Sequence, residues 1–419
     1  MRRIALMGLC FVLLVAGCGP SAPAAPTTLP PTPTPATVTA APPTATRLPP
    51  TATVPPTTTE PPATPTPTPR PDALYRGDAQ RTGQVAEAGL RTLPAVAWEK
   101  HGLGLGVHGA PVAAGGVLYV PNQTGRLRAF DGATGEQLWL AGQPQRDSIV
   151  SSPAIAGGLV YVSLAGGLYA LDAADGRERW HYSSDEFIYT APLVVAGTVY
   201  LSAQGGHTAA LDAATGVPRW TAEIGGFVLW PIAYAGGRLF VSTDAVMLAL
   251  DAVTGAELWR FTAPLDWAPH AVDAEAGRVY AGNGDGAFYA LDAATGAPLW
   301  SFPTDGLYWG GAAVGGGRVF AGNRNQTVYA FDAATGDQLW SFATEDWAVS
   351  DPVLAGDVLY VGVGNHDRRE GPRPLYALDA ATGAELWRFQ GDGRLLSAPE
   401  AADGTIYLLT ATGSLYALR

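Results

Sequence analysis

The chain has 419 residues and a formal net charge of −12, from 25 Lys and Arg against 37 Asp and Glu, and 47% of its residues are hydrophobic. Its 52 Gly and 35 Pro interrupt long helices, which argues against an all-helical bundle. A single lysine, Lys100, gives no basic footprint for nucleic acid or for an anionic membrane surface, and two cysteines exclude a disulfide scaffold or a cysteine-rich zinc fold.

The first element along the chain is a targeting segment. Arg2 and Arg3 precede an apolar run, Ile4–Ala16, that is too short to span a membrane. The run ends in Val-Ala-Gly-Cys18, which resembles the processing box of a bacterial lipoprotein signal. The resemblance implies removal of residues 1–17, lipidation of the Cys18 thiol and an extracytoplasmic location anchored to a membrane by that lipid. An ordinary secretory signal with a chance cysteine is the alternative.

The second element is a proline- and threonine-rich stretch. Residues 19–71 hold 19 of the 35 prolines and 16 threonines, with only three charged residues. Such a composition cannot bury enough apolar surface to offset chain entropy. At roughly 3.1 Å per residue the stretch could reach on the order of 150 Å. We predict a disordered tether over residues 18–71, which includes the lipidated cysteine.

From residue 95 onward the sequence repeats itself with a period near forty. The last spacing is longer because of an insert, His366–Pro374. A period of this length indicates a stacked or radial array of small units. The repeats are marked by eight tryptophans: Trp98, Trp139, Trp180, Trp220, Trp259, Trp300, Trp340 and Trp387.

One repeat, Ser151–Trp180, shows how each unit is organised. Short alternating runs at Ser151–Ile155, Leu159–Ser163, Leu168–Leu171 and Glu178–Tyr182 are separated by turns rich in Gly and Asp. Such runs predict four antiparallel strands, here named A to D from the axis outward. Four strands per forty residues are typical of a β-propeller blade.

The blade count comes from the two ends of the repeat region. Seven complete A-to-D units end at Trp387, and the chain then adds only strands A, B and C. The missing D strand is supplied by Ala95–Lys100, which carries Trp98. We therefore predict an all-β, eight-bladed propeller over residues 72–419, closed by pairing of the first and last strands.

The motif around the tryptophans points to a family. The pattern Ala-x-Asp-x-x-x-Gly-x-x-x-Trp occurs seven times, as in Ala129, Asp131, Gly135 and Trp139. It resembles the tryptophan-docking motif of quinoprotein-type, PQQ-like repeat propellers, in which the tryptophan packs between blades. Tyr75–Gly83 also resembles the lead-in of such proteins. At the eighth copy Arg419 replaces the motif Asp, so we expect a looser blade there.

The resemblance implies two functional classes. Quinoprotein dehydrogenases bind pyrroloquinoline quinone (PQQ) and calcium, often beside a vicinal disulfide that this chain cannot form once Cys18 is lipidated. BamB-like lipoproteins instead scaffold outer-membrane assembly without catalysis. The blades here are nearly free of insertions. We therefore favour a non-catalytic scaffold or binding protein of the cell envelope without a cofactor. A PQQ-dependent dehydrogenase, with Asp351 as a possible base, is the alternative.

Other catalytic and metal-binding patterns are missing from the sequence. There is no His-Glu-x-x-His, Gly-x-Ser-x-Gly or Walker loop, and the six histidines lack metal-ligand spacing. His108 and His270 fall at nearly equivalent places four repeats apart, and we interpret them as polar loop residues. The repeated Asp of the motif is interpreted as a turn residue. We predict no catalytic residue and no metal site.

Four tryptophans are not required by the repeat, and all four fall in predicted D-to-A loops, among several carboxylates. Aromatic rings beside carboxylates suit a sugar, a cationic ligand or an apolar segment of a protein partner. The alternative is that the rings pack against one another and close the loops. The predicted recognition surface comprises Trp230, Trp267, Trp309 and Trp347, with Tyr189 and Tyr308 at its margin.

Overall fold

The computed structural model describes residues 72–104, 109–122, 125–142, 151–164, 166–263, 267–348, 350–364, 371–395 and 397–419. The predicted signal segment, Cys18 and the predicted tether lie outside these ranges, as do His108 and His366. Within them the chain is built of strands. No helix of the described part is long and apolar enough to cross a membrane.

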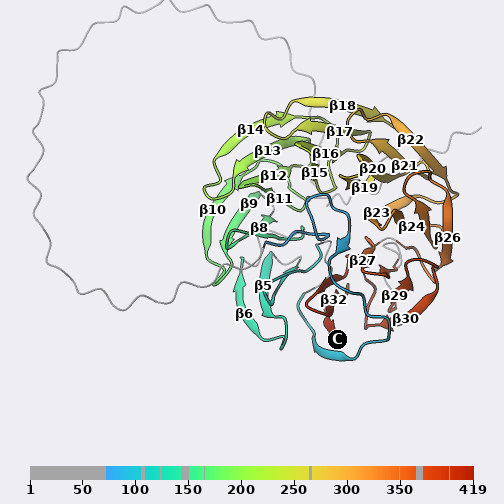
Figure 1. The fold of residues 1–419 in the computed structure, drawn as a ribbon. Coiled ribbons are helices and arrows are strands. Elements are labelled where there is room, and N and C mark those ends of the chain that lie inside the picture. The colour runs from blue at the N-terminus through green and yellow to red at the C-terminus, as the bar shows by residue number, and fades with distance from the viewer. Residues whose placement is uncertain are drawn as a thin grey trace, which may run out of the picture. The chain divides into compact units, whose positions relative to one another are not determined.

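Each repeat folds into an antiparallel four-stranded sheet, arranged around a common axis (Figure 1). Glycine pairs such as Gly157 and Gly158, with φ of 58° and 79°, form the A-to-B turn in a conformation that other residues rarely adopt. The first four blades comprise β3 (Val112–Ala114), β4 (Val117–Asn122), β5 (Arg126–Asp131) and β6 (Gln137–Ala141); β7 (Ala154–Ala156), β8 (Leu159–Leu164), β9 (Gly167–Asp172) and β10 (Glu178–Ser183); β11 (Leu193–Val195), β12 (Thr198–Ser202), β13 (His207–Asp212) and β14 (Pro218–Glu223); and β15 (Ala233–Ala235), β16 (Arg238–Ser242), β17 (Val246–Asp251) and β18 (Glu257–Thr262).

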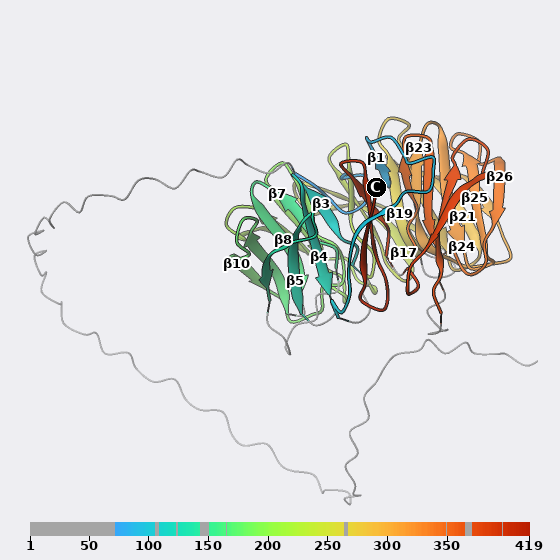
Figure 2. The same cartoon turned by 90° about the horizontal axis from the view of Figure 1, so that it is seen from below.

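The next blades repeat the same order, so the described residues form eight sheets and the predicted eight-bladed propeller is confirmed. Seen from the side, the strands of neighbouring blades stand next to one another (Figure 2). These blades comprise β19 (Trp267–Asp273), β20 (Arg278–Asn283), β21 (Ala287–Asp292) and β22 (Pro298–Pro303); β23 (Tyr308–Gly315), β24 (Arg318–Asn323), β25 (Thr327–Asp332) and β26 (Gln338–Ala343); β27 (Val353–Ala355), β28 (Val358–Gly362), β29 (Pro374–Asp379) and β30 (Glu385–Gln390), with β1 (Gln84–Val85) parallel to β27; and β31 (Glu400–Ala402), β32 (Thr405–Leu409), β33 (Leu415–Leu418) and β2 (Val96–Lys100).

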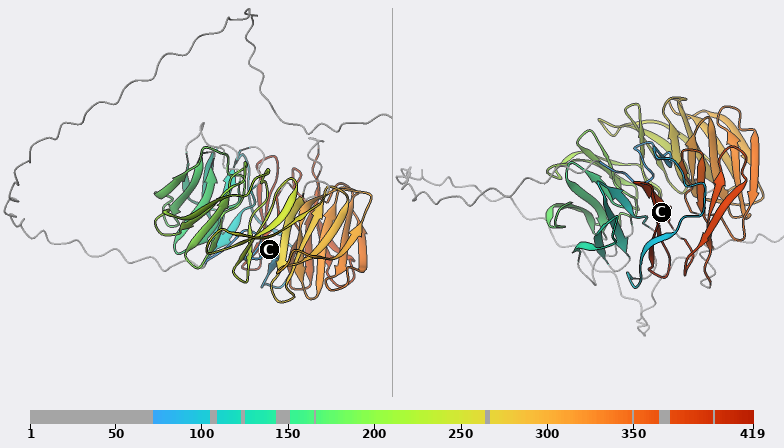
Figure 3. Two further views of the ribbon diagram at one scale, coloured as in Figure 1. Left: turned by 90° about the horizontal axis from the view of Figure 1, so that it is seen from above. Right: turned by 60° about the horizontal axis from the view of Figure 1, so that its bottom comes forward.

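The two ends of the repeat region close the eighth blade. Strand β2 pairs antiparallel with β33, with Glu99 opposite Tyr416, and lies beside the C-terminal strands in Figure 3. Ala95 and Arg419 exchange both backbone hydrogen bonds at 3.0 Å. The predicted closure through Ala95–Lys100 is therefore confirmed, and no blade in the described residues is left without its outer strand.

The motif tryptophans dock between blades as the resemblance implies. The indole of Trp139 donates to the carbonyl of Ala173 in the next blade at 3.1 Å. Gly176, at φ +74°, lies flat against the same ring, where an added Cβ would come within 2.7 Å of it. The same indole-to-carbonyl bond is made by Trp98, Trp180, Trp220, Trp259, Trp300 and Trp340.

The motif aspartates hold the C-to-D turns. Asp131 accepts hydrogen bonds from the backbone N–H of Thr134 at 2.8 Å and from its hydroxyl at 2.9 Å. These bonds stabilise the ionised form and lower the pKa of Asp131. Equivalent bonds recur in the other motif copies, for example at Asp292 and Asp332. The prediction that these carboxylates are turn residues is confirmed.

The lead-in, residues 72–85, lies against the innermost strands at one end of the axis and is called here the axial strap (Figure 1). The strands that it contacts continue directly into A-to-B turns, so the D-to-A loops open at the opposite end. Backbone hydrogen bonds of 2.7–2.9 Å connect it to five blades, pairing Ala73 with Ile155, Ala79 with Tyr234, Gln80 with Val272, Thr82 with Val314, and Gly83 with Leu354.

Candidate functional site

The axial strap is anchored by a buried arginine. Arg81 is 1% exposed and donates to the carbonyl oxygens of Ile232 and Pro192, both at 3.1 Å. It also donates to the carbonyl of Tyr75, within the strap, at 2.6 Å. Burial lowers the pKa of Arg81 to about 10, so the guanidinium is charged at neutral pH. Its planar fork joins the strap to two blades through neutral acceptors.

Asp351, the sequence candidate for a base, holds the other half of the strap. The hydroxyl of Tyr75 donates to its Oδ2, and the backbone N–H of Gly311 donates to its Oδ1 at 2.5 Å. The Arg76 Nε lies 3.9 Å from Oδ2, and both side chains are buried. Burial, with the negative charge of Asp351, raises the pKa of Tyr75 well above its usual value. Asp351 therefore anchors the strap instead of lining the open end of the axis.

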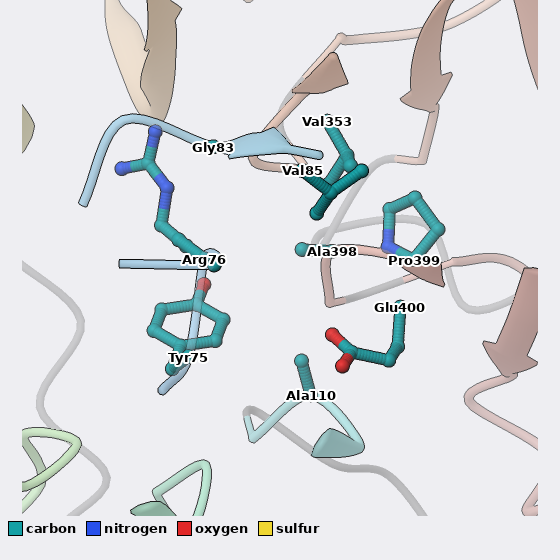
Figure 4. Close-up of a pocket in the computed structure, with 10 residues that line it drawn as sticks. Tyr75, Arg76, Gly83, Val85, Ala110, Val353, Ala398, Pro399 and Glu400 are labelled. Carbon is teal, nitrogen blue, oxygen red and sulfur yellow. The ribbon is translucent and has the colours of Figure 1, made fainter. Parts of the chain in front are cut away.

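A small cavity lies between the strap and the eighth blade (Figure 4). Tyr75, Arg76, Ala398 and Glu400 are among its lining residues, and the Glu400 carboxylate points inward. Glu400 accepts a hydrogen bond from the backbone N–H of Ala113 at 2.9 Å. Burial raises the pKa of the Glu400 carboxyl to about 8, so it carries a proton at neutral pH.

His270 is a core residue. It was expected in a loop, but it lies in β19 and is 1% exposed. One ring nitrogen is 2.9 Å from the carbonyl of Phe240 and the other is 3.2 Å from the hydroxyl of Ser242. Burial lowers the pKa of His270 to about 3, which keeps the imidazole neutral. The described residues contain no group of three or more His, Cys, Asp or Glu side chains placed to hold a metal ion.

Two members of the predicted recognition surface are inside the core. Trp267 is 1% exposed and packs edge-on against Tyr289 and Phe261, at 5.4 and 5.8 Å between ring centroids. Tyr308 is 2% exposed and packs on Phe288 at 5.3 Å. Both belong to strands instead of loops, because β19 begins at Trp267 and β23 at Tyr308. Trp309, also expected in a loop, is the second residue of β23. For these two residues the alternative interpretation, rings that pack against one another, is correct.

The other three tryptophans form one continuous array with an arginine. The rings of Trp230 and Trp309 meet edge to face at 5.9 Å. The guanidinium of Arg324 lies 5.8 Å from the ring centre of Trp309 and 3.6 Å from that of Trp347. Trp309 is 41% exposed, and Trp230 and Trp347 are half-buried. The array therefore reaches from the loop before the fourth blade to the loop before the seventh.

Exposed apolar side chains extend this array along the D-to-A loops. They are Phe187 at 52%, Phe227 at 41%, Leu229 at 36% and Leu307 at 38% exposure. Tyr189 is half-buried beneath Phe187, with ring centroids 5.8 Å apart. We call the combined set the aromatic face: Phe187, Phe227, Leu229, Trp230, Leu307, Trp309 and Trp347.

The sequence did not lead us to two features of the structure. Arg324 was not singled out, although it opens a B-to-C hairpin whose counterparts carry Gly284, Gln204 and Asp244. The sequence signal for it was a cation at a hairpin between Trp309 and Trp347, two tryptophans that the docking motif does not require. The buried arginines of the strap gave no such signal. Arg81 donates to backbone carbonyls, which every sequence provides, and Arg76 lies beside Asp351 from a distant blade.

Comparison with known proteins places the chain in a family. A family model described as outer membrane protein assembly factor BamB, of the PQQ-like repeat type, matches residues 124–227, 220–307, 303–369 and 368–419. The chain belongs to this PQQ-like repeat family. The match covers most of the propeller, in agreement with the docking motif.

Relatives with similar sequences have different activities in their names. The chain is 30% identical over 184 residues to the serine/threonine-protein kinase AfsK of Streptomyces griseus, 40% of this chain and 23% of AfsK. It is 29% identical to BamB of Burkholderia pseudomallei, over 36% of this chain and 41% of that protein. It is 33% identical to the quinohemoprotein alcohol dehydrogenase of Comamonas testosteroni, over 27% of this chain and 19% of that enzyme. In each case the chain spans less than half of the relative.

Solved structures share the fold at low identity. BamB from Moraxella catarrhalis superposes with a TM-score of 0.63 at 18% identity, covering 78% of this chain and 98% of that one. The Comamonas testosteroni quinohemoprotein alcohol dehydrogenase gives 0.69 at 18% identity, covering 83% and 80%. The fold is thus common to BamB and to an alcohol dehydrogenase, so function must be argued from the site.

The residues around Asp351 do not fit a calcium–quinone centre. Both of its carboxylate oxygens accept hydrogen bonds, from Tyr75 and from the Gly311 N–H, and Arg76 lies beside them. A calcium ion needs several oxygen ligands, and the described residues gather no cluster of carboxylates there. We therefore derive no catalytic step through Asp351.

Proposed function

We propose that the chain is a lipid-anchored, extracytoplasmic binding protein that presents its aromatic face to a protein or other component of the cell envelope, without catalysis. The observation that carries the proposal is the array of Trp230, Trp309, Arg324 and Trp347. The docking motif does not require these rings, and exposed rings lower solubility unless they bind something. Relatives named BamB, an assembly factor, support a scaffolding role.

The proposed lipid anchor, Cys18, precedes the propeller in the sequence. Cys18 follows the lipoprotein-like box, and residues 18–71 would separate the lipid from the propeller. The axial strap fills one end of the axis, which supports use of the opposite, aromatic end for binding. A partner could then be held at a distance from the membrane set by the tether.

Crosslinking in the source cells tests the binding role. Wild-type chain, Trp309→Ala and Leu299→Ala would be expressed at equal levels, and their crosslinked adducts compared. Leu299 is a matched control, because it is an apolar side chain 47% exposed on the outer strand β22. We expect an adduct from wild type and Leu299→Ala that Trp309→Ala loses. An adduct pattern that is the same in all three would refute the aromatic face as the binding site.

A quinone-dependent dehydrogenase is the second candidate, favoured by 33% identity to the Comamonas testosteroni enzyme over 27% of this chain. It is tested by dye-linked oxidation of alcohols and sugars with added PQQ and calcium. The proposed binding role predicts no dye reduction above the level of a heat-denatured control. Cofactor-dependent reduction that saturates with alcohol would establish the enzyme instead.

A further inference from the structure

The aromatic face repeats one position around the ring. Phe187, Phe227, Leu307 and Trp347 each lie seven residues after a motif tryptophan. Each accepts, through its backbone carbonyl, a hydrogen bond from the B-to-C hairpin of its own blade, at 2.8–3.1 Å. The equivalent backbone geometry places the four apolar side chains at matching points on the third, fourth, sixth and seventh blades.

This spacing indicates the size of the occupant. The third and seventh blades are not neighbours, and their apolar positions are separated by several inter-blade loops. A single sugar ring or a small cation stacked on Trp309 would leave Phe187 and Phe227 exposed. An extended polypeptide can contact successive positions, because alternate side chains of a strand-like segment point the same way. Aromatic residues with a polar rim are also typical of protein interfaces.

Exposed carboxylates flank three of the four apolar positions, those of Phe187, Phe227 and Leu307. Glu186 accepts from the Gly205 N–H at 2.9 Å, and Asp244 accepts from the Phe227 N–H at 2.8 Å. Asp305 accepts from the side-chain amide of Asn325 at 2.8 Å. These donors are neutral and do not form ion pairs with the three carboxylates. Arg324, the cation within the array, is stacked on Trp347.

From this arrangement we infer that the aromatic face binds an extended polypeptide segment in which aromatic or leucine side chains are flanked by lysine or arginine. The apolar side chains of the segment cover the repeated positions, and its cations pair with Glu186, Asp244 and Asp305. The inference rests on the proposed binding function and specifies the chemistry of the partner.

Selection from a random dodecapeptide display library tests the inference. The full chain would be immobilised, with Trp309→Ala/Phe227→Ala and Leu299→Ala chains in parallel and thermal melting to verify folding. We expect the wild type and Leu299→Ala to enrich peptides that combine Lys or Arg with Phe, Trp or Leu. The doubly substituted chain should bind those peptides at least tenfold more weakly.

A second set of variants isolates the charge. The triple variant Glu186→Gln/Asp244→Asn/Asp305→Asn keeps side-chain acceptors and removes three charges. It should bind the selected peptides several-fold more weakly, and its affinity for them should depend less on salt concentration. Enrichment of acidic or uncharged peptides, or no enrichment that depends on Trp309 and Phe227, overturns the inference. If crosslinking in cells still depends on Trp309 in that case, the proposed function stands and only the partner chemistry is wrong. If neither peptide enrichment nor crosslinking in cells depends on Trp309, the aromatic face is not a binding site.

Discussion

The indole N–H of Trp387 donates a hydrogen bond to the carbonyl of Leu90, 297 residues earlier in the chain, at 2.6 Å. The other motif tryptophans donate to the turn of the next blade, but the eighth blade has Arg419 where the motif Asp belongs. Leu90 supplies the missing acceptor, and its N–H donates to the Tyr360 hydroxyl. Arg91 pairs with Asp379 at 2.9 Å. The segment between the axial strap and β2 therefore completes an interface that the sequence suggested would be looser.

Closure of the ring depends on Trp98. Its indole donates to the Gly132 carbonyl at 3.0 Å, and its ring packs against Gly135 and Tyr407. Trp98→Ala should lower the free energy of unfolding by roughly 3–5 kcal/mol, as for other large-to-small core changes. Denaturant unfolding measures this value. Removal of residues 19–71 is the control, expected to leave the value unchanged. Equal stability of Trp98→Ala and wild type would mean that β2 is not an integral outer strand.

Arg81 should resist even a conservative change. Arg81→Lys keeps the positive charge. Position 81 has a φ of 57°, and replacing one non-glycine residue by another adds no backbone strain there. Lysine, however, cannot reproduce the planar guanidinium that donates to several carbonyls at once. Buried acceptors without donors should cost about 2 kcal/mol or more of unfolding free energy. Arg179→Lys, in an exposed ion pair with Asp172, should stay within about 0.5 kcal/mol of wild type. Similar small effects of the two changes would show that the strap is not anchored through Arg81.

Glu400 should make the propeller less stable as the pH rises. Its pKa is raised to about 8 in the folded protein, whereas an unfolded glutamate titrates near about 4.3. Between these values the folded protein keeps a proton that the unfolded chain releases, so the free energy of unfolding falls from about pH 5 to pH 8. Glu400→Gln has no titrating carboxyl at this position, so this pH dependence should be lost. At pH 8 its free energy of unfolding should exceed that of the wild type by about 1 kcal/mol or more. Melting curves that shift in parallel for both proteins across this range would disprove the assignment.

Replacing Trp267 should destabilise the fold far more than replacing Trp309, because only Trp267 is in the core. Trp267→Ala removes a buried ring and should cost about 3–5 kcal/mol of unfolding free energy. Trp309→Ala removes a ring that is 41% exposed, and its cost should be near or below about 1 kcal/mol. Chemical denaturation of the two variants, beside Trp300→Ala as a motif reference, provides the comparison. A large loss for Trp309→Ala would place it in the core with Trp267.

The sequence predicted the blades well because their signals are local. Gly and Asp turns, alternating strands and the spacing of Trp98 from Trp139 are each set within one repeat. The difference between Trp267 and Trp309 could not be predicted in this way. Trp267 follows its motif tryptophan by eight residues and is buried, as is Tyr308 at the same offset, whereas Trp309 follows by nine and is exposed. The pairing of β19 and of β23 is irregular at both places, so the repeat did not show which offset turns a ring inward. The partnership of Trp387 with Leu90 was also hidden, because a backbone carbonyl leaves no mark in the sequence.

The central claim is that this propeller acts by binding through the aromatic face. The most direct test compares Trp309→Ala/Trp347→Ala with Trp300→Ala, measuring crosslinked partner per folded molecule in the source cells and thermal stability of the purified chains. The proposed role predicts that the first variant melts near wild type but captures no partner, whereas the second melts lower and captures normally per folded molecule. Unchanged capture by a folded Trp309→Ala/Trp347→Ala chain would contradict it.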